Sequence, residues 1–288
     1  MSFIFKRGSK LILDDGENRY QLLVSDFSFS ETFLEQGYNQ ATLHDPNAIE
    51  NYTYSNAKSN ATFQFDMYFS DSKVVENRVL EWYGFSQTGD FPTRISSLSN
   101  TLNLYIDMGT YAILIDSAVL ENLSFKLDPR GVLALNVTGS GVTTTEQGVS
   151  LPTTGTLYTQ EGFSNNYLTA SIGGQDVTNV SGITLELTKS VEWVNTQTVH
   201  DALSNTLYIK DRFTATNLSV SGTISTIKTT DSEPKYVNNT QLLIGVGDYM
   251  LINLNSCNIT ERVSVDSGIL SKVADYKLLN SVDSTIII

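Results

Sequence analysis

The sequence predicts an all-β fold of two tandem units, with a short helix in the first unit. Three observations support this prediction: apolar and polar residues alternate over short stretches, β-branched and aromatic residues are abundant, and one long pattern occurs twice. Alternation with a period of two is typical of strands with one face on a core and the other in water. Val, Ile, Thr, Tyr and Phe favour such pleated surfaces.

The expected strands are spread over both halves of the chain. Their alternating apolar positions, in chain order, are Phe27 and Phe29; Phe63, Phe65, Met67 and Phe69; Phe125 and Leu127; Leu185 and Leu187; and Leu218 and Val220. Each of these runs is short, as strands of globular proteins are.

The long pattern returns after 156 residues (180 − 24 and 201 − 45). Residues 24–45 begin with Val-Ser and end with Asn-Gln-Ala-Thr-Leu-His-Asp, and residues 180–201 begin with Val-Ser and end with Asn-Thr-Gln-Thr-Val-His-Asp. A second match follows, between residues 109–114 and 247–252. Self-similarity over a long period indicates one structural unit built twice.

The repeat divides the chain into two units of ordinary domain size. The first unit spans residues 1–144 and the second spans residues 159–288. Residues 145–158, between them, are polar and rich in turn-forming residues, which is typical of a linker.

One helix is expected, in the first unit. Asp71 or Ser72 can cap its N-terminus, and Gly84 ends it. Its apolar face is formed by Val75, Val79, Leu80 and Tyr83. The matching region of the second unit, residues 228–235, is a turn-rich loop by the same criteria.

Two long segments, roughly residues 33–58 and 189–212, are rich in polar residues and Tyr and show weak periodicity. A connection longer than about 12–15 residues without regular structure is uncommon and usually functional. We therefore expect both segments to be long functional loops. Each contains one copy of the matched Asn-x-x-Thr-x-His-Asp pattern.

The two His-Asp pairs, His44–Asp45 and His200–Asp201, are the obvious catalytic candidates, since an Asp can orient an imidazole for general-base work. No recognisable nucleophile or oxyanion motif accompanies them. We interpret the pairs as turn caps or interface contacts and expect no enzymatic activity. The spacing of His, Cys and Asp fits neither a zinc site nor a calcium loop, so no metal or other cofactor is expected.

Composition narrows the classes of function. The chain has 288 residues, of which 40% are hydrophobic, and its net charge is −13. An acidic chain is a poor binder of nucleic-acid phosphates, although it suits a wall that nucleic acid must pass without adhering. No apolar run approaches the roughly 18 residues of a membrane span, and no secretory signal is recognised. The single cysteine, Cys257, excludes a disulfide scaffold.

Three further features carry expectations. Trp82 lies on the expected helix and should belong to the core, whereas Trp193 lies in a long segment and could anchor an interface. The C-terminal residues Ile286, Ile287 and Ile288 are apolar and β-prone, which is an aggregation hazard if exposed. We expect them to pair with another strand, for which a neighbouring subunit is one candidate.

These features resemble the tail tube proteins of long-tailed bacteriophages. The residues that carry the resemblance are those at 22–30, the loop that follows them, the helix ending at 80–84, the late strands within 102–139, and residues 177–183 and 217–222 of the second unit. The resemblance implies tube-type β-sandwich or barrel units that assemble into a ring-shaped β-barrel. Rings then stack into a hollow channel through which DNA is delivered to the host.

In that family the long loop contacts the next ring. Here this role would fall on Glu35, Asn39, His44, Asp45, Trp193, Asn195, His200 and Asp201. Some relatives carry two units per chain and build a ring from three chains, so the resemblance favours a trimer over a hexamer. It also implies a virion protein that is assembled in the host cytoplasm. The implied partners are other tail proteins such as sheath, tape measure and baseplate, together with DNA that passes without specific binding, and no membrane is involved.

Three alternatives stay open at this point. The nearest is a tube initiator or baseplate hub ring of the same tail, which would be present in far fewer copies than a tube protein. Another is a β-sandwich receptor- or carbohydrate-binding module, which predicts a monomer with an aromatic groove. The last is a hydrolase that uses His44 or His200.

Overall fold

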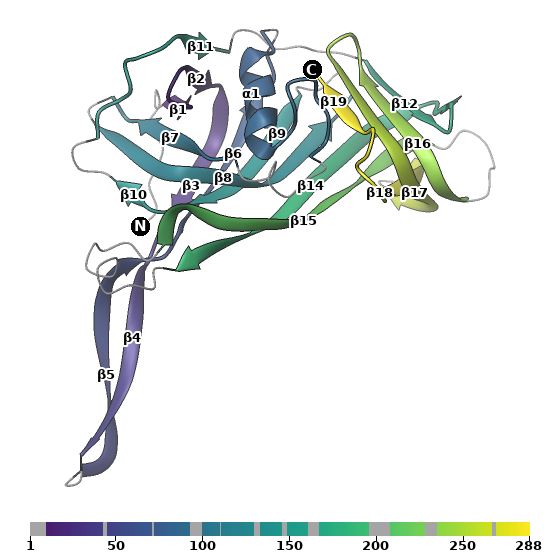
Figure 1. Cartoon of the computed structure of the whole chain (residues 1–288). Helices are drawn as coiled ribbons and strands as arrows, with labels where there is room; N and C mark the ends of the chain where they lie inside the picture. The colour runs from purple at the N-terminus through teal and green to yellow at the C-terminus, as the bar shows by residue number, and fades with distance from the viewer. Residues whose placement is uncertain are drawn as a thin grey trace.

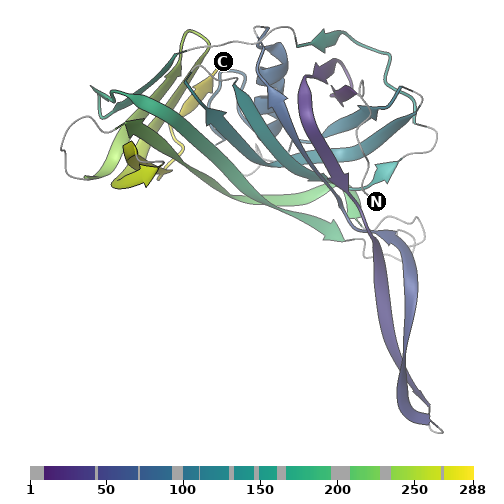
Figure 2. The ribbon, with the colours of Figure 1, turned by 180° about the vertical axis from the view of Figure 1, so that it is seen from behind.

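The computed structural model describes residues 10–42, 45–70, 72–92, 100–109, 111–129, 133–145, 149–160, 167–195, 208–227, 235–266 and 269–288. Strands hold most of these residues, and the expected helix is present as α1 (Val74–Tyr83). The predicted all-β class, with a short helix in the first half, is therefore confirmed. Figures 1 and 2 show a body of curved sheets from which one long ribbon projects.

The first half of the chain supplies seven strands that pair in the order β2-β1-β7-β8-β9-β6-β3, all antiparallel. Their bounds are β1 (Lys10–Asp14), β2 (Arg19–Leu22), β3 (Val24–Ser30), β6 (Ala61–Tyr68), β7 (Leu102–Asp107), β8 (Ala112–Leu127) and β9 (Ala134–Gly141). Strand β8 is long enough to join two sheets, because its first part pairs with β7 and its second part with β9.

The second half repeats this pairing. Its seven strands follow the order β13-β12-β16-β17-β18-β15-β14, again antiparallel. Their bounds are β12 (Leu168–Ile172), β13 (Gln175–Asp176), β14 (Val180–Asn195), β15 (Tyr208–Ile227), β16 (Tyr236–Val246), β17 (Met250–Asp266) and β18 (Ile269–Leu278). Each strand thus has a counterpart at the same place in the first half, for example β3 for β14 and β8 for β17.

The two halves share a continuous sheet. Strand β14 pairs with the second part of β8, from Ile183 opposite Leu127 to Thr188 opposite Asn122. Eight strands therefore run side by side in the order β3-β6-β9-β8-β14-β15-β18-β17. This sheet is curved but does not close into a barrel within one chain.

Five short or separate strands complete the fold. They are β10 (Thr144–Thr145) on β8, β11 (Leu157–Thr159) parallel to β2, β19 (Thr285–Ile287) on β17, and the pair β4 (Phe33–Thr42) and β5 (Asp45–Lys58), which forms a sheet of its own. The segment expected to be a linker lies against the first half, since the guanidinium of Arg19 donates to the carbonyls of Pro152 and Gly155 at 2.9 and 3.0 Å. The division into units at 144 and 159 remains a prediction.

The described parts of the two expected long loops are instead strands. In the first segment they form β4 and β5, and residues 43–44 lie outside the described residues. In the second segment, residues 189–195 end β14 and residues 208–212 begin β15, while residues 196–207 lie outside the described residues. The loop prediction relied on weak periodicity. A two-stranded ribbon without a second layer behind it has no face on a core, so its sequence needs no strict alternation of apolar residues.

Helix α1 lies against the core where the two halves meet. Its N-terminal residue is preceded by Lys73 in a left-handed conformation (φ 61°) without a side-chain cap, so the cap position is Lys73 and not Ser72. Asp71, the other expected cap, lies outside the described residues. Gly84 ends the helix as predicted, at φ 127°, with its N–H directed to the carbonyls of Leu80 and Glu81. The predicted apolar face is buried, and so is Trp82, whose Nε1 donates to the Ala118 carbonyl at 2.8 Å.

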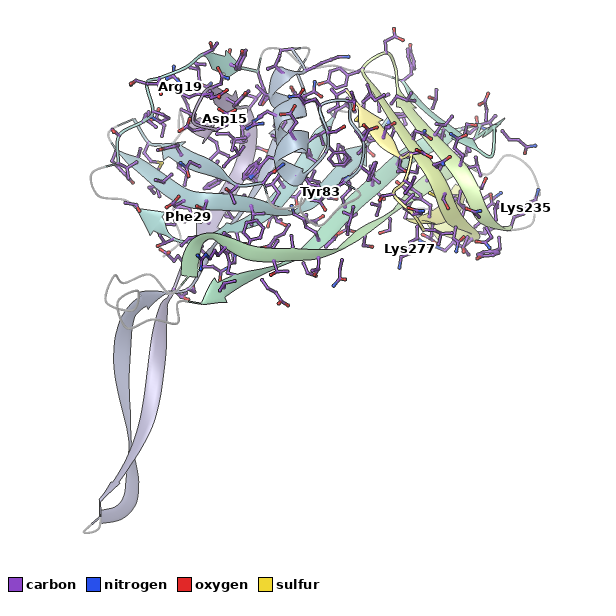
Figure 3. The ribbon with its side chains drawn as sticks, viewed as in Figure 1. Asp15, Arg19, Phe29, Tyr83, Lys235 and Lys277 are labelled. Atoms are coloured by element: carbon purple, nitrogen blue, oxygen red, sulfur yellow. The ribbon has the colours of Figure 1, made fainter. Side chains whose placement is uncertain are left out.

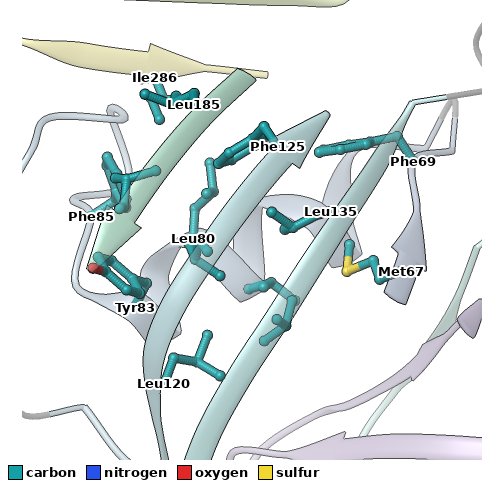
Figure 4. Close-up of a cluster of buried hydrophobic side chains, with 14 of the residues drawn as sticks. Met67, Phe69, Leu80, Tyr83, Phe85, Leu120, Phe125, Leu135, Leu185 and Ile286 are labelled. Carbon is teal, nitrogen blue, oxygen red and sulfur yellow. The ribbon is translucent and has the colours of Figure 1, made fainter. Parts of the chain in front are cut away.

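One apolar core extends across both halves. In Figure 4, Leu80 of α1 and Phe125 of β8 face the same cluster as Leu185 of β14 and Ile286 of β19. All four side chains are at most 3% exposed. Burial of shared apolar surface therefore holds the two halves together as one body.

Candidate assembly surfaces

The most prominent candidate surface is the projecting ribbon, which we define as β4 and β5 (Figures 1 and 2). In it Glu35 lies opposite Tyr54, Asn39 opposite Glu50, and Thr42 opposite Asp45. Three predicted interface residues, Glu35, Asn39 and Asp45, are thus carried away from the body, while His44 lies outside the described residues. A two-stranded hairpin alone is only marginally stable in water, so we expect a contact with another surface to stabilise this ribbon.

The second half has an equivalent element, which we call the docked arm: β14 from Lys189 onward, together with β15 up to Thr216. The indole Nε1 of Trp193 donates to Ser140 Oγ of β9 at 2.9 Å, and its ring lies 5.0 Å from that of Phe213. Trp193, expected to anchor an interface, is thus engaged within the chain.

The other predicted residues of this region lie beyond Trp193. Asn195 closes the described end of the docked arm, opposite Tyr208. His200 and Asp201 lie outside the described residues. Their roles remain predictions.

Lys189 lies at the root of the docked arm and was missed by the sequence analysis. Its side chain is 2% exposed, and Nζ donates to the Tyr83 carbonyl at 3.0 Å while lying 4.7 Å from the centre of the Tyr83 ring. Tyr83 is the last residue of α1, so the ammonium group satisfies a free carbonyl at the negative end of the helix. Burial lowers the pKa of Lys189 to about 7, against the opposing attraction of Glu121.

A signal for Lys189 was present in the sequence. Leu185, Leu187 and Lys189 stand at every second position of the chain, and the first two side chains are buried in the core. Strict alternation places the third on the core side as well. A lysine at such a position must find partners in the interior.

The N-terminal side of α1 contacts the second half. Tyr249, in the turn between β16 and β17, donates its hydroxyl to the Ser70 carbonyl at 2.7 Å and accepts from Lys73 Nζ at its own carbonyl at 3.1 Å. Glu76 Oε1 accepts from the Ser70 N–H at 2.6 Å and from Gln160 Nε2 at 2.7 Å. The helix is therefore tied to both halves by polar contacts as well as by its apolar face.

The eight-stranded sheet presents a polar face, which we define by three rows of laterally paired residues. The first row is Ser28, Gln64, Thr138, Asn122, Thr188 and Ser219. The second is Ser25, Asp66, Asn136, Ser124, Glu186, Ser221, Lys277 and Asn258. The third is Tyr68, Ala134, Lys126, Thr184, Thr223, Asp275 and Thr260.

Charge is sparse on this polar face. Its rows hold three acidic residues, Asp66, Glu186 and Asp275, and two basic ones, Lys126 and Lys277 (Lys277 is labelled in Figure 3). Hydroxyl and amide groups make up most of the rest. The acidic wall expected from the net charge is therefore not found on this face, which is close to neutral.

The C-terminal strand is paired within the chain. Ile286 of β19 lies opposite Ile252 of β17, its N–H donates to the Gly89 carbonyl at 2.8 Å, and its side chain is 1% exposed. Pairing of this segment was expected, but the chain itself supplies the partner strand. Participation of Ile287 and Ile288 in a contact with a neighbouring subunit remains a prediction.

Reactive chemistry is sparse in the described part of the chain. Cys257 is fully buried, which raises the pKa of its thiol to about 12 and keeps it protonated. Among the described residues, no cluster of three or more His, Cys, Asp or Glu side chains could hold a metal ion. In the same residues, no helix is long and apolar enough to cross a membrane.

Comparison with known proteins gives one family. The model of the Bacteriophage Baseplate Tube Protein Family matches residues 1–287. No curated protein matches the chain. The family match spans both halves, the projecting ribbon and the docked arm.

Proposed function

The chain belongs to the bacteriophage baseplate tube protein family, and we propose from this premise that it builds a ring of the tail tube at the baseplate. Membership of the family makes it a structural protein of the phage tail and a component of the virion. In the proposed role, copies of the chain close a hollow ring, rings stack on one another or on neighbouring tail rings, and DNA leaves through the channel.

The observation that carries this proposal is the open eight-stranded sheet with one apolar and one polar face. An open sheet has unpaired edges, and closure of a ring removes them. The polar face would line a water-filled channel while the apolar face stays on the core. Three chains would give twenty-four strands (three times eight), and barrels of about 16–18 strands already hold an aqueous channel.

A trimeric ring is favoured over a hexameric one. The matching strand orders of the two halves support the view that the chain is a duplicated tube unit, so that three chains provide six units. The contacts of α1 and Lys189 with both halves fix the angle between the two units of one chain. The remaining angles of the ring would be set between chains.

The near-neutral polar face suits passage of DNA without binding. Binding to a duplex is driven by clustered Lys and Arg that neutralise phosphates and release counterions. Hydroxyl and amide groups, such as those of Thr138, Asn122 and Thr188, keep the wall hydrated without such attraction. We therefore propose that DNA slides along this face and is not held by it.

The projecting ribbon is the proposed contact to the adjacent ring, through Glu35, Asn39, His44 and Asp45. The end of the docked arm, with Asn195, His200 and Asp201, would make the matching contact from the second half. Trp193 would act indirectly by holding this arm on β9. Sheath, tape measure and other baseplate proteins are the proposed partners outside the ring, and assembly is proposed to take place in the host cytoplasm.

Electron microscopy of the purified chain tests this function. Negative staining should show rings with an open centre, and the mass in solution should equal that of three chains. A protein that stays monomeric at high concentration would contradict the proposal and favour a β-sandwich binding module. The copy number in purified virions, measured by quantitative mass spectrometry, then separates a single ring, as in an initiator or hub, from the many rings of a main tube.

A further inference from the structure

We propose that the edge strand β3 of one copy pairs, antiparallel, with the second part of β17 of another copy. The register is the one that β14 and β8 use inside the chain. This inference rests on the proposed function, because it assigns the strand junction that closes the ring. It commits to a second copy of this chain as the occupant of both sheet edges.

The internal junction provides the template. Strand β14 holds the same place in the strand order of the second half as β3 holds in the first, and the two begin 156 residues apart (180 − 24). Strand β17 likewise corresponds to β8, and the two begin 138 residues apart (250 − 112). A register shift near the start of both β3 and β14 supports the correspondence.

Each of the two edges has one strand partner among the described residues. Within the described part of the chain, β6 is the strand that pairs with β3. On β17, pairing with β16 ends at Thr260, and the Glu261 N–H makes one further bond to the Lys235 carbonyl at 2.9 Å. Past that point, β18 is the described strand partner of β17, and Val263 is 40% exposed although it is apolar.

The register follows from the internal junction. Inside the chain, Leu185 lies opposite Phe125 and Glu186 opposite Ser124. Leu185 corresponds to Phe29 (185 − 156) and Phe125 corresponds to Val263 (125 + 138), so Phe29 is placed opposite Val263. In the same way Ser30 (186 − 156) is placed opposite Arg262 (124 + 138).

This register keeps the two faces of the sheet apart. Apolar Phe29 meets apolar Val263, and polar Ser30 meets Arg262, whose guanidinium already bonds Asp275 of the polar face. The polar face therefore continues from one copy to the next. A slip by one residue would put Phe29 on the wet side and Ser30 on the core side, so the register is strongly specified.

The pairing also has a defined end. One step further, Glu31 would lie opposite Glu261, and like charges directly opposite each other are unfavourable. Each carboxylate has its own partners in the chain: Glu31 accepts from the Thr144 N–H at 2.9 Å, and Glu261 pairs with Lys272 at 2.6 Å. The proposed junction therefore joins residues 27–30 of one copy to residues 262–265 of the next.

Disulfide trapping between two single variants tests the junction. Residues opposite each other in an antiparallel pair have Cα atoms about 4.5–5.5 Å apart, within the range of a disulfide. An equimolar mixture of S30C and R262C chains, oxidised after assembly, should give a covalent dimer that contains one chain of each kind. The native Cys257 should stay out of the reaction because it is buried.

Two controls fix the interpretation. The double variant S124C/E186C, which carries the equivalent pair of the internal junction, should form its disulfide within one chain under the same conditions. A mixture of S30C with T260C is two residues out of register, so its Cα atoms would lie about 7–8 Å apart and it should cross-link about tenfold less.

Each outcome bears on the proposal. Rings in the micrographs without the S30C–R262C dimer, while S124C/E186C closes, would overturn this junction and leave the proposed function standing. A preference for S30C–T260C would overturn the register. If neither rings nor cross-links form, the proposed function fails together with the inference.

Discussion

The projecting ribbon and the docked arm occupy the same place in the two halves, yet one leaves the body and the other lies on it. The docked arm extends β14 and β15, and Trp193 fastens it to Ser140 of the first half. The projecting ribbon follows β3 and precedes β6, and it forms a sheet by itself. Figure 2 shows the contrast from behind.

The difference lies in the strands that β14 and β3 meet. Strand β14 pairs with β15 on one side and with β8 of the first half on the other. Among the described residues, β6 is the strand that pairs with β3. In the proposed junction the other side of β3 meets β17 of another copy, so that the first half repeats outward what the second half does inward. Variants of both regions test this asymmetry.

Removal of the projecting ribbon should have the largest effect. We would join Gln36 to Thr53, which lie opposite each other, through an Asn-Gly turn. Since the ribbon forms a separate sheet, the stability of the body should change by no more than about 0.5 kcal/mol. Rings should still close, but they should no longer stack or enter virions. Electron microscopy of assemblies and mass spectrometry of particles measure this, and stacked rings of the shortened chain would contradict the role of the ribbon.

The equivalent core positions Leu185 and Phe29 should respond differently to truncation. Leu185 is 0% exposed at the internal junction, so L185A should lower the free energy of unfolding by about 2–5 kcal/mol. Phe29 is only partly buried in one chain, so F29A should cost about 1 kcal/mol. Urea unfolding at low concentration, where single chains dominate, measures both.

In ring assembly the order of the two variants should be reversed, with F29A showing the larger effect. If Phe29 is covered by a second copy, F29A should raise the concentration needed for ring closure by about tenfold, the equivalent of about 1.4 kcal/mol. Sedimentation over a concentration series measures this. An F29A chain that assembles like the wild type would show that β3 is not at the junction.

The sequence predicted the local features well, for a physical reason. Period-two alternation reports which side of a strand meets the core, so residues such as Phe63, Phe65 and Met67 were placed correctly. Gly84 was recognised as the end of α1 because only glycine easily takes the backbone conformation required there.

Partners remote in sequence were beyond such reasoning. The alternation of Leu185 and Leu187 reads the same whether β14 pairs with β8 or with another chain, because periodicity records the face and not the neighbour. The start of α1 was misplaced because Lys73 takes a left-handed conformation that its residue type does not favour. The projecting ribbon was read as a loop because neither of its faces has to be apolar.

Lys189 should make the free energy of unfolding depend on pH. Methionine is the matched apolar replacement for this lysine. Burial lowers its pKa in the folded state from 10.5 to about 7, so between these values the unfolded chain binds more protons than the folded one. The contribution of Lys189 to the free energy of unfolding therefore rises with pH between about 7 and 10.5, by up to about 1.4 kcal/mol per pH unit. Below about pH 7 this contribution is constant.

The K189M variant lacks this contribution. The difference in unfolding free energy, wild type minus K189M, should increase from pH 7 to pH 10. Taking the difference removes the titration of Cys257 and the tyrosines, which both proteins share. K277M, at an exposed lysine of the polar face, is the control for the change from lysine to methionine itself. A flat difference for K189M would mean that Lys189 stays charged in the folded protein.

The smallest effect is expected at the far end of the docked arm. In W193F the bond from the indole to Ser140 Oγ is lost, which should cost about 0.5–1.5 kcal/mol. S140A removes the same bond from the other side and also a bond that Ser140 donates to Glu121. A double-mutant cycle with both changes isolates the Trp193–Ser140 coupling, for which we expect about 1 kcal/mol in urea unfolding. A coupling near zero would mean that this anchor does not hold the docked arm on the first half, and the contrast with the projecting ribbon would then rest on the β14–β8 junction.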